Sequence, residues 1–589
     1  MMTIQNRMPP AGDPPTFRRV PLIVGALAIL AIGVLSMLPI VTRQPHAETT
    51  PEEFSAERAL EHIAIIAEEP HPMGSAANAR VRSYLESELT ALGLDPQLQS
   101  MTVPDYYGAP GATVEAVNVM ARLEGLDSTG AIALVAHYDS TPWTFGANDN
   151  AAAVAAILDT ARALLAGPAI RNDVIVLLTD GEEPAPRYGS TAFVAQHPWA
   201  ADVGFVVNFE AAGGSGQSMV VELNGPHEWL VEGLAEAAAH PVAFSFLTDT
   251  VKLFGGIGTD FDPFAARNVP GFHLAYLRGT PIYHTFADST DNVGLGSLQQ
   301  HGSYAVSLTR QFGDLDLTKP PRSGELVFFT ALRSWIVRYP VGWAVPLASM
   351  AAAILAVALA RRVGRRELHL WLLLLGSGVV LVGVVAAMLA STVVWSLLSK
   401  ARQMPAVGES YAYLFALLAV GAGFGALIWR GAKRRWSNLD AAPSVVLVWV
   451  ALAVVTSVLL PGASYLFVWP ALGGSIALIW SAGAHPGRAS RFVSLILVAV
   501  PSLLLMVPAV DTFFLMALPR PGNPDSDLAE TIAVVIFLAV LVVALIASIA
   551  GQPGARTRPR DVPAEVRPTL DLLDQQQQTS KATPTSFMG

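Results

Sequence analysis

Histidine and carboxylate side chains follow runs of apolar residues at several points in this chain. They are His137 and Asp139 after AIALVA, Asp149 in GANDN, Glu182 and Glu183 in LTDGEE, Glu210 in VVNFE, and His284 in PIYHT. Imidazole nitrogens and carboxylate oxygens bind divalent metals, and a carboxylate can also act as a general base. The chain has no cysteine, so disulfides and thiolate metal sites are excluded, and any metal must be held by His, Asp or Glu.

The residue types suit a pair of hydrolytic metal ions. Two histidines and three carboxylates, with one carboxylate shared, suffice for two four- or five-coordinate metals completed by water. Such a set of oxygen and nitrogen ligands fits Zn²⁺, with Mn²⁺ or Co²⁺ as substitutes. Common signatures do not compete with this interpretation. HEWLV at 227–231 lacks the second histidine of HExxH, and GGSGQ at 213–217 lacks the last glycine of a nucleophile elbow.

Each candidate residue also has an ordinary structural interpretation. Asp149 stands where an aspartate can cap a helix without binding a metal. Glu182 and Glu183 are adjacent like charges, as in a solvated turn. A single histidine is more often structural than a ligand, and His71 and His273 occur nearby without a visible role. No single residue predicts the metal centre. The prediction rests on their combination, because three successive predicted strands all end in histidine or carboxylate side chains.

Residues 51–315 have the pattern of a soluble α/β domain. Predicted helices lie at 56–69, 77–93 and 150–166, and predicted strands at 131–136, 173–179, 204–210, 218–223 and 271–277. This alternation indicates a mostly parallel or mixed central sheet flanked by helices. Sites in such sheets form at the carboxyl ends of the strands, where the candidate residues stand. Asp139, two residues after His137, points the same way and can hold the other imidazole nitrogen.

The composition indicates that part of the chain lies in a membrane. The 589 residues are too many for one core, and they are 52% hydrophobic and 14% charged, with a mean hydropathy of +0.44. Residues 20–42 are uncharged and long enough to cross a bilayer. We interpret them as a retained anchor, because the apolar core of the alternative, a cleaved signal peptide, would be shorter. The net charge of −10 gives no electrostatic reason to expect nucleic acid binding.

Seven further spans are predicted near the C-terminus. They lie roughly at 342–360, 370–398, 411–429, 443–460, 463–483, 491–517 and 531–550. Basic residues gather in alternate connections, at 361–366, 430–435 and 488–491, and again after the last span at 556–560. With the anchor this predicts eight crossings, both termini in the cytoplasm, and the soluble domain in the periplasm, outside the cell or in an organelle lumen. Splitting 491–517 into two spans would give nine crossings, and the terminal arginines argue against it.

The predicted domains follow from these patterns. They are a cytoplasmic N-terminus at 1–19, the anchor at 20–42, the α/β domain at 51–315, a linker at 316–340, a membrane domain of about seven helices at 341–550, and a disordered cytoplasmic tail at 551–589.

The order of the polar stretches resembles the co-catalytic di-zinc aminopeptidases and glutamate carboxypeptidases. HYD, GANDN, GEE, NFE and YHT match the family's pieces in order, over about residues 55–315, and PHPMGS at 70–75 matches the opening. A soluble domain followed by many spans is most similar to the endoplasmic-reticulum metallopeptidase subgroup, with its vacuolar and bacterial membrane-anchored relatives. The resemblance implies a zinc exopeptidase fold and a peptide substrate.

The resemblance also implies a role for each site residue. His137 and Glu210 would bind one zinc, Glu183 and His284 the other, and Asp149 would bridge the two. Glu182 would be the general base, Asp139 would orient His137, and Tyr283 would steady the oxyanion. The chain departs from many relatives at 258–264, where GTDFDPF replaces a Ser-Asp-His stretch, as in the reticulum subgroup.

Three functions follow from these features. The first is a membrane-anchored zinc metallopeptidase, most simply an aminopeptidase. The second is a receptor or binding domain on an inactive peptidase scaffold, against which the intact set of candidate ligands argues. The third is a transporter, against which the scarcity of charges in the spans argues, since essentially one, Asp511, lies within them.

Overall fold

The computed structural model describes most of the chain from residue 49 onward. The described residues are 49–104, 111, 113–183, 187–319, 323–332, 335–400, 407–481, 488–518 and 529–550, with Ala31. The predicted anchor at 20–42 (apart from Ala31), the cytoplasmic N-terminus at 1–19 and the tail at 551–589 lie outside these residues.

A mixed sheet forms the centre of the α/β domain. Its seven described strands are β1 (Gln97–Pro104), β2 (Thr113–Leu123), β3 (Ala131–His137), β4 (Asp173–Thr179), β5 (Val203–Ala211), β6 (Met219–Asn224) and β7 (Gly271–Tyr276), in the order β1-β2-β4-β3-β5-β7-β6. The four inner strands β4, β3, β5 and β7 are parallel, and the outer pairings are antiparallel. Parallel strands end at the same edge, so β3, β4 and β5 bring the residues that follow them together.

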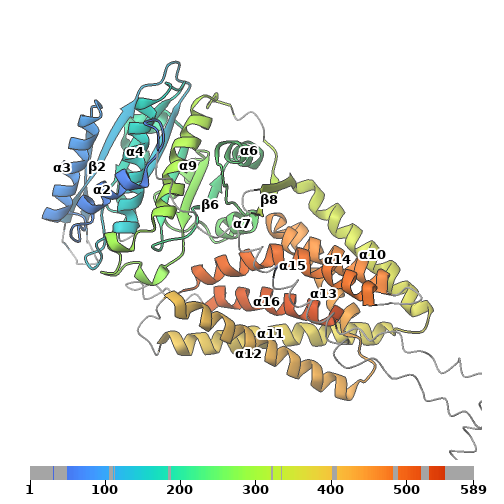
Figure 1. Cartoon of the computed structure of the whole chain (residues 1–589). Coiled ribbons are helices and arrows are strands. Elements are labelled where there is room, and N and C mark those ends of the chain that lie inside the picture. The colour runs from blue at the N-terminus through green and yellow to red at the C-terminus, as the bar shows by residue number, and fades with distance from the viewer. Residues whose placement is uncertain are drawn as a thin grey trace, which may run out of the picture.

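Helices cover both faces of this sheet, as Figure 1 shows. The described helices of the domain are α2 (Ala56–Ile66), α3 (Ala76–Ala91), α4 (Ala153–Ala166), α5 (Tyr188–Gln196), α6 (His227–Ala237), α7 (Ser245–Leu253), α8 (Asp262–Ala266) and α9 (Leu295–Gly313). Along β3, Ile132 and Leu134 join the core under α2, α4 and α9, while Ala133 and Val135 join the core under α5 and α8. Both faces are therefore apolar, which explains why the inner strands read as unbroken apolar runs.

The α/β fold class is confirmed, as are the five predicted strands and three predicted helices. The strands β1 and β2 were not predicted. β1 is an edge strand whose residues are mostly exposed, so it carries little of the apolar signal by which strands are recognised. The predicted linker at 316–340 contains a further pair, β8 (Leu326–Ala331) and β9 (Trp335–Pro340), which form an antiparallel hairpin.

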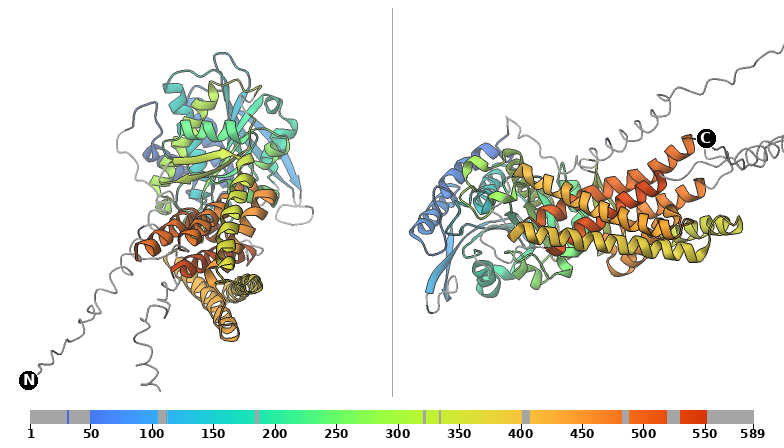
Figure 2. Two further views of the ribbon diagram at one scale, coloured as in Figure 1. Left: turned by 90° about the vertical axis from the view of Figure 1, so that its right-hand side faces the viewer. Right: turned by 90° about the horizontal axis from the view of Figure 1, so that it is seen from below.

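The C-terminal helices form a membrane bundle, which confirms a multi-span membrane domain. They are α10 (Ala344–Gly364), α11 (Leu370–Lys400), α12 (Val407–Arg435), α13 (Ala441–Leu459), α14 (Tyr465–Ser481), α15 (Arg488–Met516) and α16 (Ala529–Ala550). Within the described part of the chain, six of them are long and apolar enough to cross a bilayer, and α14 is shorter, with 17 residues. Residues 488–516 form one helix despite Pro501 and Pro508. Figure 2 shows the bundle projecting from one end of the α/β domain.

The α/β domain and the membrane bundle share one apolar core. The ring of Phe246 in α7 lies 5.2 Å from that of Phe513 in α15, and Phe329 in β8 stacks on Tyr465 in α14 at 4.4 Å between centroids. Ser245 donates a hydrogen bond from its hydroxyl to the carbonyl oxygen of Gly462 at 2.6 Å. Because the apolar contacts continue across the boundary, the two parts form one packed body rather than a domain on a tether.

An aromatic cluster at the centre of the α/β domain predicts a large stability effect. Phe312 in α9 is fully buried and stacks on Phe205 at 4.1 Å between centroids, with Trp229 and Phe272 at its edges. Phe312→Ala removes a whole ring from a packed core, so it should lower the free energy of unfolding by about 3–5 kcal/mol. Denaturant unfolding of the detergent-solubilised chain measures this, with Leu126→Ala, at 76% exposure, as the unaffected control.

Candidate metal centre

Five of the predicted site residues converge on two overlapping groups at the carboxyl edge of the sheet. One group is His137, Asp149 and Glu210, and the other is Asp149, Glu183 and His284. Within each group, one candidate ligand atom from every residue lies within 4.8 Å of the others. Asp149 belongs to both groups, so the arrangement offers two adjacent three-residue sites joined by one carboxylate.

The end of β3 aims His137 into the first group. Its Nδ1 lies 3.0 Å from the main-chain oxygen of Asp139, to which Nδ1–H can donate, and 3.5 Å from the Asp139 carboxylate. A proton held on Nδ1 leaves the lone pair of Nε2 free. Nε2 lies 3.3 Å from Asp149 Oδ1 and 3.5 Å from Glu210 Oε2. The contact between Nδ1 and Asp139 therefore turns Nε2 toward Asp149 and Glu210, as in a metal-binding histidine.

The carboxylate of Asp139 also holds the turn that carries the two glutamates. The main-chain amides of Glu182 and Glu183 donate to Asp139 Oδ1 at 3.2 Å and to Oδ2 at 3.0 Å. The turn depends on Gly181, which has φ +79°, and a Cβ there would lie 2.7 Å from Met73 Sδ. One buried aspartate thus fixes both the strand end and the neighbouring turn.

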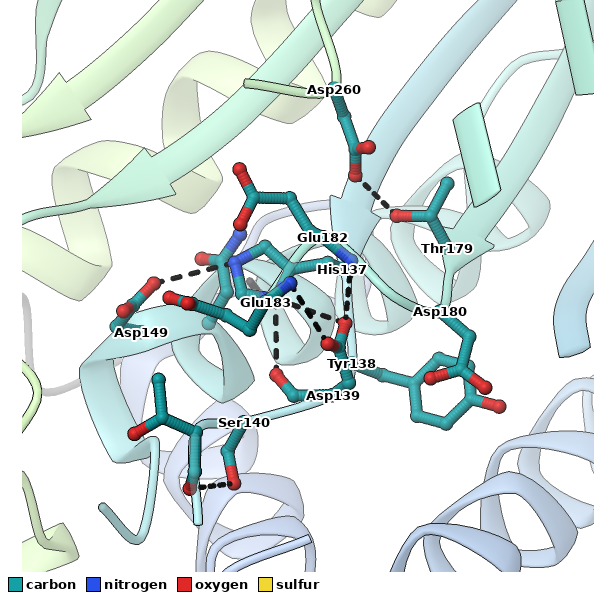
Figure 3. Close-up of polar contacts among 12 residues, drawn as sticks. His137, Tyr138, Asp139, Ser140, Asp149, Thr179, Asp180, Glu182, Glu183 and Asp260 are labelled. Atoms are coloured by element: carbon teal, nitrogen blue, oxygen red, sulfur yellow. Dashed lines mark hydrogen bonds and ion pairs between the residues drawn. The ribbon is translucent and has the colours of Figure 1, made fainter. Parts of the chain in front are cut away.

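The two glutamate side chains diverge from this turn, as Figure 3 shows. Glu183 extends toward Asp149, is 6% exposed, and places Oε1 2.5 Å from His284 Nε2. Glu182 is half-buried and belongs to neither candidate metal group. The interpretation of this stretch as a solvated turn is therefore wrong for Glu183.

Asp149 does not cap the helix that follows it. α4 begins at Ala153, and no side chain caps its N-terminus. Asp149 lies in the preceding irregular turn η3 (Ala147–Ala152), and its two oxygens face different histidines. Oδ1 lies 3.3 Å from His137 Nε2, and Oδ2 lies 3.0 Å from His284 Nε2. Its position between the two groups, rather than a cap, accounts for this aspartate.

The turn η3 is held by a second buried carboxylate. Asp288 accepts hydrogen bonds from the main-chain and side-chain amides of Asn148, both at 2.8 Å, and from the amide of Asp149 at 3.1 Å. Burial raises the pKa of Asp288 to about 6. Asp288 therefore fixes the backbone at Asp149 through main-chain amides, as Asp139 fixes the turn that carries Glu182 and Glu183.

His284 reaches the second group from the loop after β7. Its backbone has φ +54°, an uncommon conformation for a residue with a side chain. The ring of Tyr283 stacks on the His284 ring, with centroids 3.8 Å apart and an angle of 17° between planes. Tyr283 thus lies beside the candidate site and fixes the plane of its neighbour.

The electrostatics of the cluster suit bound cations. Burial lowers the pKa of His137, but Glu210, Asp139 and Asp149 outweigh it and raise that pKa well above its ordinary value. The pKa of His284 rises to about 10, since Glu183 and Asp149 outweigh its burial in the same way. Burial raises the pKa of Glu183. Without a metal, the imidazoles must carry the positive charge that these carboxylates require.

The donor set fits divalent metal ions. Each group offers one imidazole and two carboxylates, which are ligands that Zn²⁺ accepts. Glu210 Oε1 is buried and has no hydrogen-bond partner among the described residues, a costly state for a carboxylate oxygen unless a cation neutralises it. The residues present therefore fit divalent metal ions, and Asp149 belongs to both of the groups that could hold one.

One acidic residue beside the site was not predicted. Asp260 lies in the GTDFDPF stretch, is fully buried, and accepts a hydrogen bond from the hydroxyl of Thr179. Figure 3 shows it on the side of the site where Glu182 lies. Burial raises the pKa of Glu182 well above its ordinary value, and the charges of Glu183, Glu210 and Asp260 raise it further. The resemblance gives this stretch as a departure from many relatives that is shared with the reticulum subgroup, and it assigns no role to Asp260.

Comparison with known proteins finds a peptidase family over this part of the chain. Residues 118–309, which contain all the candidate ligands, match the family model described as Peptidase family M28. "Endoplasmic reticulum metallopeptidase 1" of Rattus norvegicus is 30% identical over 311 residues, covering 49% of this chain and 34% of the relative. "Vacuolar membrane protease" of Candida dubliniensis is 28% identical over 300 residues, covering 48% and 31%. The chain thus spans about a third of the length of these relatives.

Among solved structures, a zinc aminopeptidase from Bacillus subtilis is similar to part of this chain. It has a TM-score of 0.37 and 16% sequence identity, and the match covers 45% of this chain and 97% of that one.

The shared position of Asp149 predicts that one substitution disables both metal groups. We expect Zn²⁺ added to chelator-treated protein to raise its unfolding temperature, because a ligand that binds only the folded state stabilises it, by about 2.7 kcal/mol at one hundred times its Kd. Asp149→Ala should abolish this shift. Asp291→Ala, an exposed aspartate in the same region, should retain it, and a full shift in Asp149→Ala would contradict the bridging role.

Proposed function

We propose that the chain, whose residues 118–309 match the model of peptidase family M28, is a membrane-anchored di-zinc exopeptidase that removes residues from the amino end of peptides. The observation that carries the proposal is the pair of ligand groups joined by Asp149, each with one histidine and one further carboxylate. His137 and Glu210 would hold one zinc, and Glu183 and His284 the other. Mn²⁺ or Co²⁺ could substitute.

Two zinc ions would supply a water of lowered pKa and would polarise the carbonyl of the scissile bond. The chain supplies the proton transfer. Glu182 is adjacent in sequence to Glu183 but belongs to neither ligand group, so its carboxylate remains available for proton transfer. In this mechanism Glu182 takes a proton from the attacking water and delivers it to the leaving amine.

Positioning residues keep the reacting groups in place. Asp139 would hold His137 and, through two amides, the turn that carries Glu182. We assign to Tyr283 the role of stabilising the oxyanion of the tetrahedral intermediate, and its stacking on the ligand His284 supports this position.

The helix ends support an active site on the non-cytoplasmic side of the membrane. α10 follows directly from the hairpin of the α/β domain, and its last turn carries Arg361 and Arg362, one helix length away. α12 has Tyr411 near its start, next to the α/β domain, and Lys433, Arg434 and Arg435 in its last turn. Basic residues collect on the cytoplasmic side, so the α/β domain would face away from it.

Replacing the proposed base tests the mechanism. Glu182→Gln keeps the shape of the side chain but removes its proton acceptor, so kcat for an aminoacyl-anilide should fall by about a hundredfold or more, while zinc content stays unchanged. Glu115→Gln, an exposed residue near the start of β2, is the matched control. Undiminished kcat in Glu182→Gln would remove the assignment of the base.

Blocking the ends of a peptide tests the proposed specificity. The cluster of carboxylates favours a positively charged α-amino group, so acetylation of that group should abolish cleavage, whereas amidation of the carboxyl end should leave it intact. Mass spectrometry of a peptide-library digest reads both outcomes and shows which side chains are accepted. Trimming of acetylated peptides from the carboxyl end would instead indicate a carboxypeptidase.

A further inference from the structure

The single acidic residue noted within the predicted spans, Asp511, has a partner in the α/β domain. Asp511 lies in α15 and is 4% exposed. Its Oδ2 accepts a hydrogen bond from Arg278 Nη2 at 2.9 Å, and the two side chains form an ion pair. The hydroxyl of Tyr411 in α12 donates to the other oxygen of Asp511 at 2.8 Å. The guanidinium also lies 5.9 Å from the centre of the Tyr411 ring. Two membrane helices thus hold one arginine of the α/β domain.

Arg278 joins two loops that follow neighbouring strands. It lies two residues after β7, and its main chain exchanges hydrogen bonds with Ser215, from the Arg278 amide at 2.8 Å and the Ser215 amide at 2.9 Å. Ser215 follows β5, whose end carries the candidate ligand Glu210. The approach is close, since a Cβ at Gly213 would lie 2.3 Å from the carbonyl oxygen of Arg278. A shift of Arg278 must therefore move both loops.

Local hydrogen bonds order the segment between Arg278 and His284. The hydroxyl of Thr280 donates to the carbonyl of Leu277 at 2.8 Å, and the amide of Tyr283 donates to the carbonyl of Thr280 at 2.9 Å. Between them lies the short helical turn η5 (Thr280–Ile282). The five residues between Arg278 and His284 form a compact connection, so we expect it to transmit a displacement of Arg278 to His284.

We propose that Asp511, in the membrane bundle, is a positioning residue for the metal centre and acts through Arg278. One joined loop follows Glu210 and the other carries His284, so the ion pair acts on one ligand of each group. The expected effect of Asp511 on kcat/KM rests on the proposed function. The geometric coupling between Asp511 and the two loops can be measured without activity.

A second contact between the domains provides the matched control. Asp249 in α7 accepts a hydrogen bond from the amide of Gly462, in the turn before α14, at 2.9 Å. This contact also joins the α/β domain to the bundle, but α7 carries no candidate ligand and does not lead into either loop. Asp249→Asn therefore weakens domain contact without disturbing the ligand loops.

The test compares Asp511→Asn, Arg278→Gln, the double variant and Asp249→Asn in the full-length chain in lipid nanodiscs. Asp511→Asn keeps the size of the side chain and removes the charge that pairs with Arg278. If Asp511→Asn fails to fold, Arg278→Lys tests the same pair from the other side, because lysine keeps the charge but loses the planar fork. The readouts are hydrogen exchange of the amides in 212–216 and 277–285, the rate of zinc loss to a chelator, and kcat/KM.

We expect Asp511→Asn to speed amide exchange in both loops by about tenfold, since removing the pair favours local opening, and to lower kcat/KM by about tenfold. Zinc loss should be faster, and the double variant should be no worse than either single variant. Asp249→Asn should leave all three readouts unchanged. Unchanged loop exchange in Asp511→Asn, or equal effects in Asp249→Asn, would overturn the inference. A wild-type chain without zinc or activity would instead overturn the proposed function, and the exchange data would still decide the coupling.

Discussion

The structure of the site depends on one buried carboxylate, Asp149, placed between two imidazoles so that each of its oxygens faces a different histidine. Further carboxylates surround the same small volume, and such a concentration of negative charge in a protein interior is unstable unless cations balance it. The surrounding fold is organised to keep these groups together. Parallel strands bring the ligands to one edge, while Asp139 and Asp288 hold the backbone on either side through main-chain amides. The backbone that carries these side chains is therefore held by contacts within the protein itself.

Much of this arrangement could be predicted from the sequence, because its signals are local. The inner strands are unbroken apolar runs, and the candidate ligands stand at their ends, where strand topology brings them together. What could not be predicted depends on contacts between distant residues. Asp288 is 139 residues from the amide of Asp149 that it binds, and Asp260 is 81 residues from Thr179. The hydrophobic periodicity of the sequence gives no information on such distant pairs. That Asp149 does not cap the helix likewise became evident only from the course of the backbone through η3.

Asp511 shows the same limit in the membrane region. From the sequence it is an isolated charge in an apolar segment, which suggests either a transport pathway or an interface. The structure gives it a partner 233 residues away, in a loop beside the metal centre. A charge in a membrane helix can therefore serve a reaction outside the membrane. On the inference drawn from this pair, the bundle supports the site as well as attaching it to the membrane.

The apolar core shared by the two domains bears on how such an enzyme can be controlled in a cell. Many membrane-anchored enzymes are released by a cut in the stalk that joins them to the bilayer, and the freed domain then acts at a distance. Here Phe246 and Phe329 are buried against helices of the bundle, so a cut near the hairpin would leave the domain attached or, once detached, prone to aggregate. A peptidase of the proposed kind would therefore act at the membrane that holds it, because a cut at the hairpin would not yield a stable free domain.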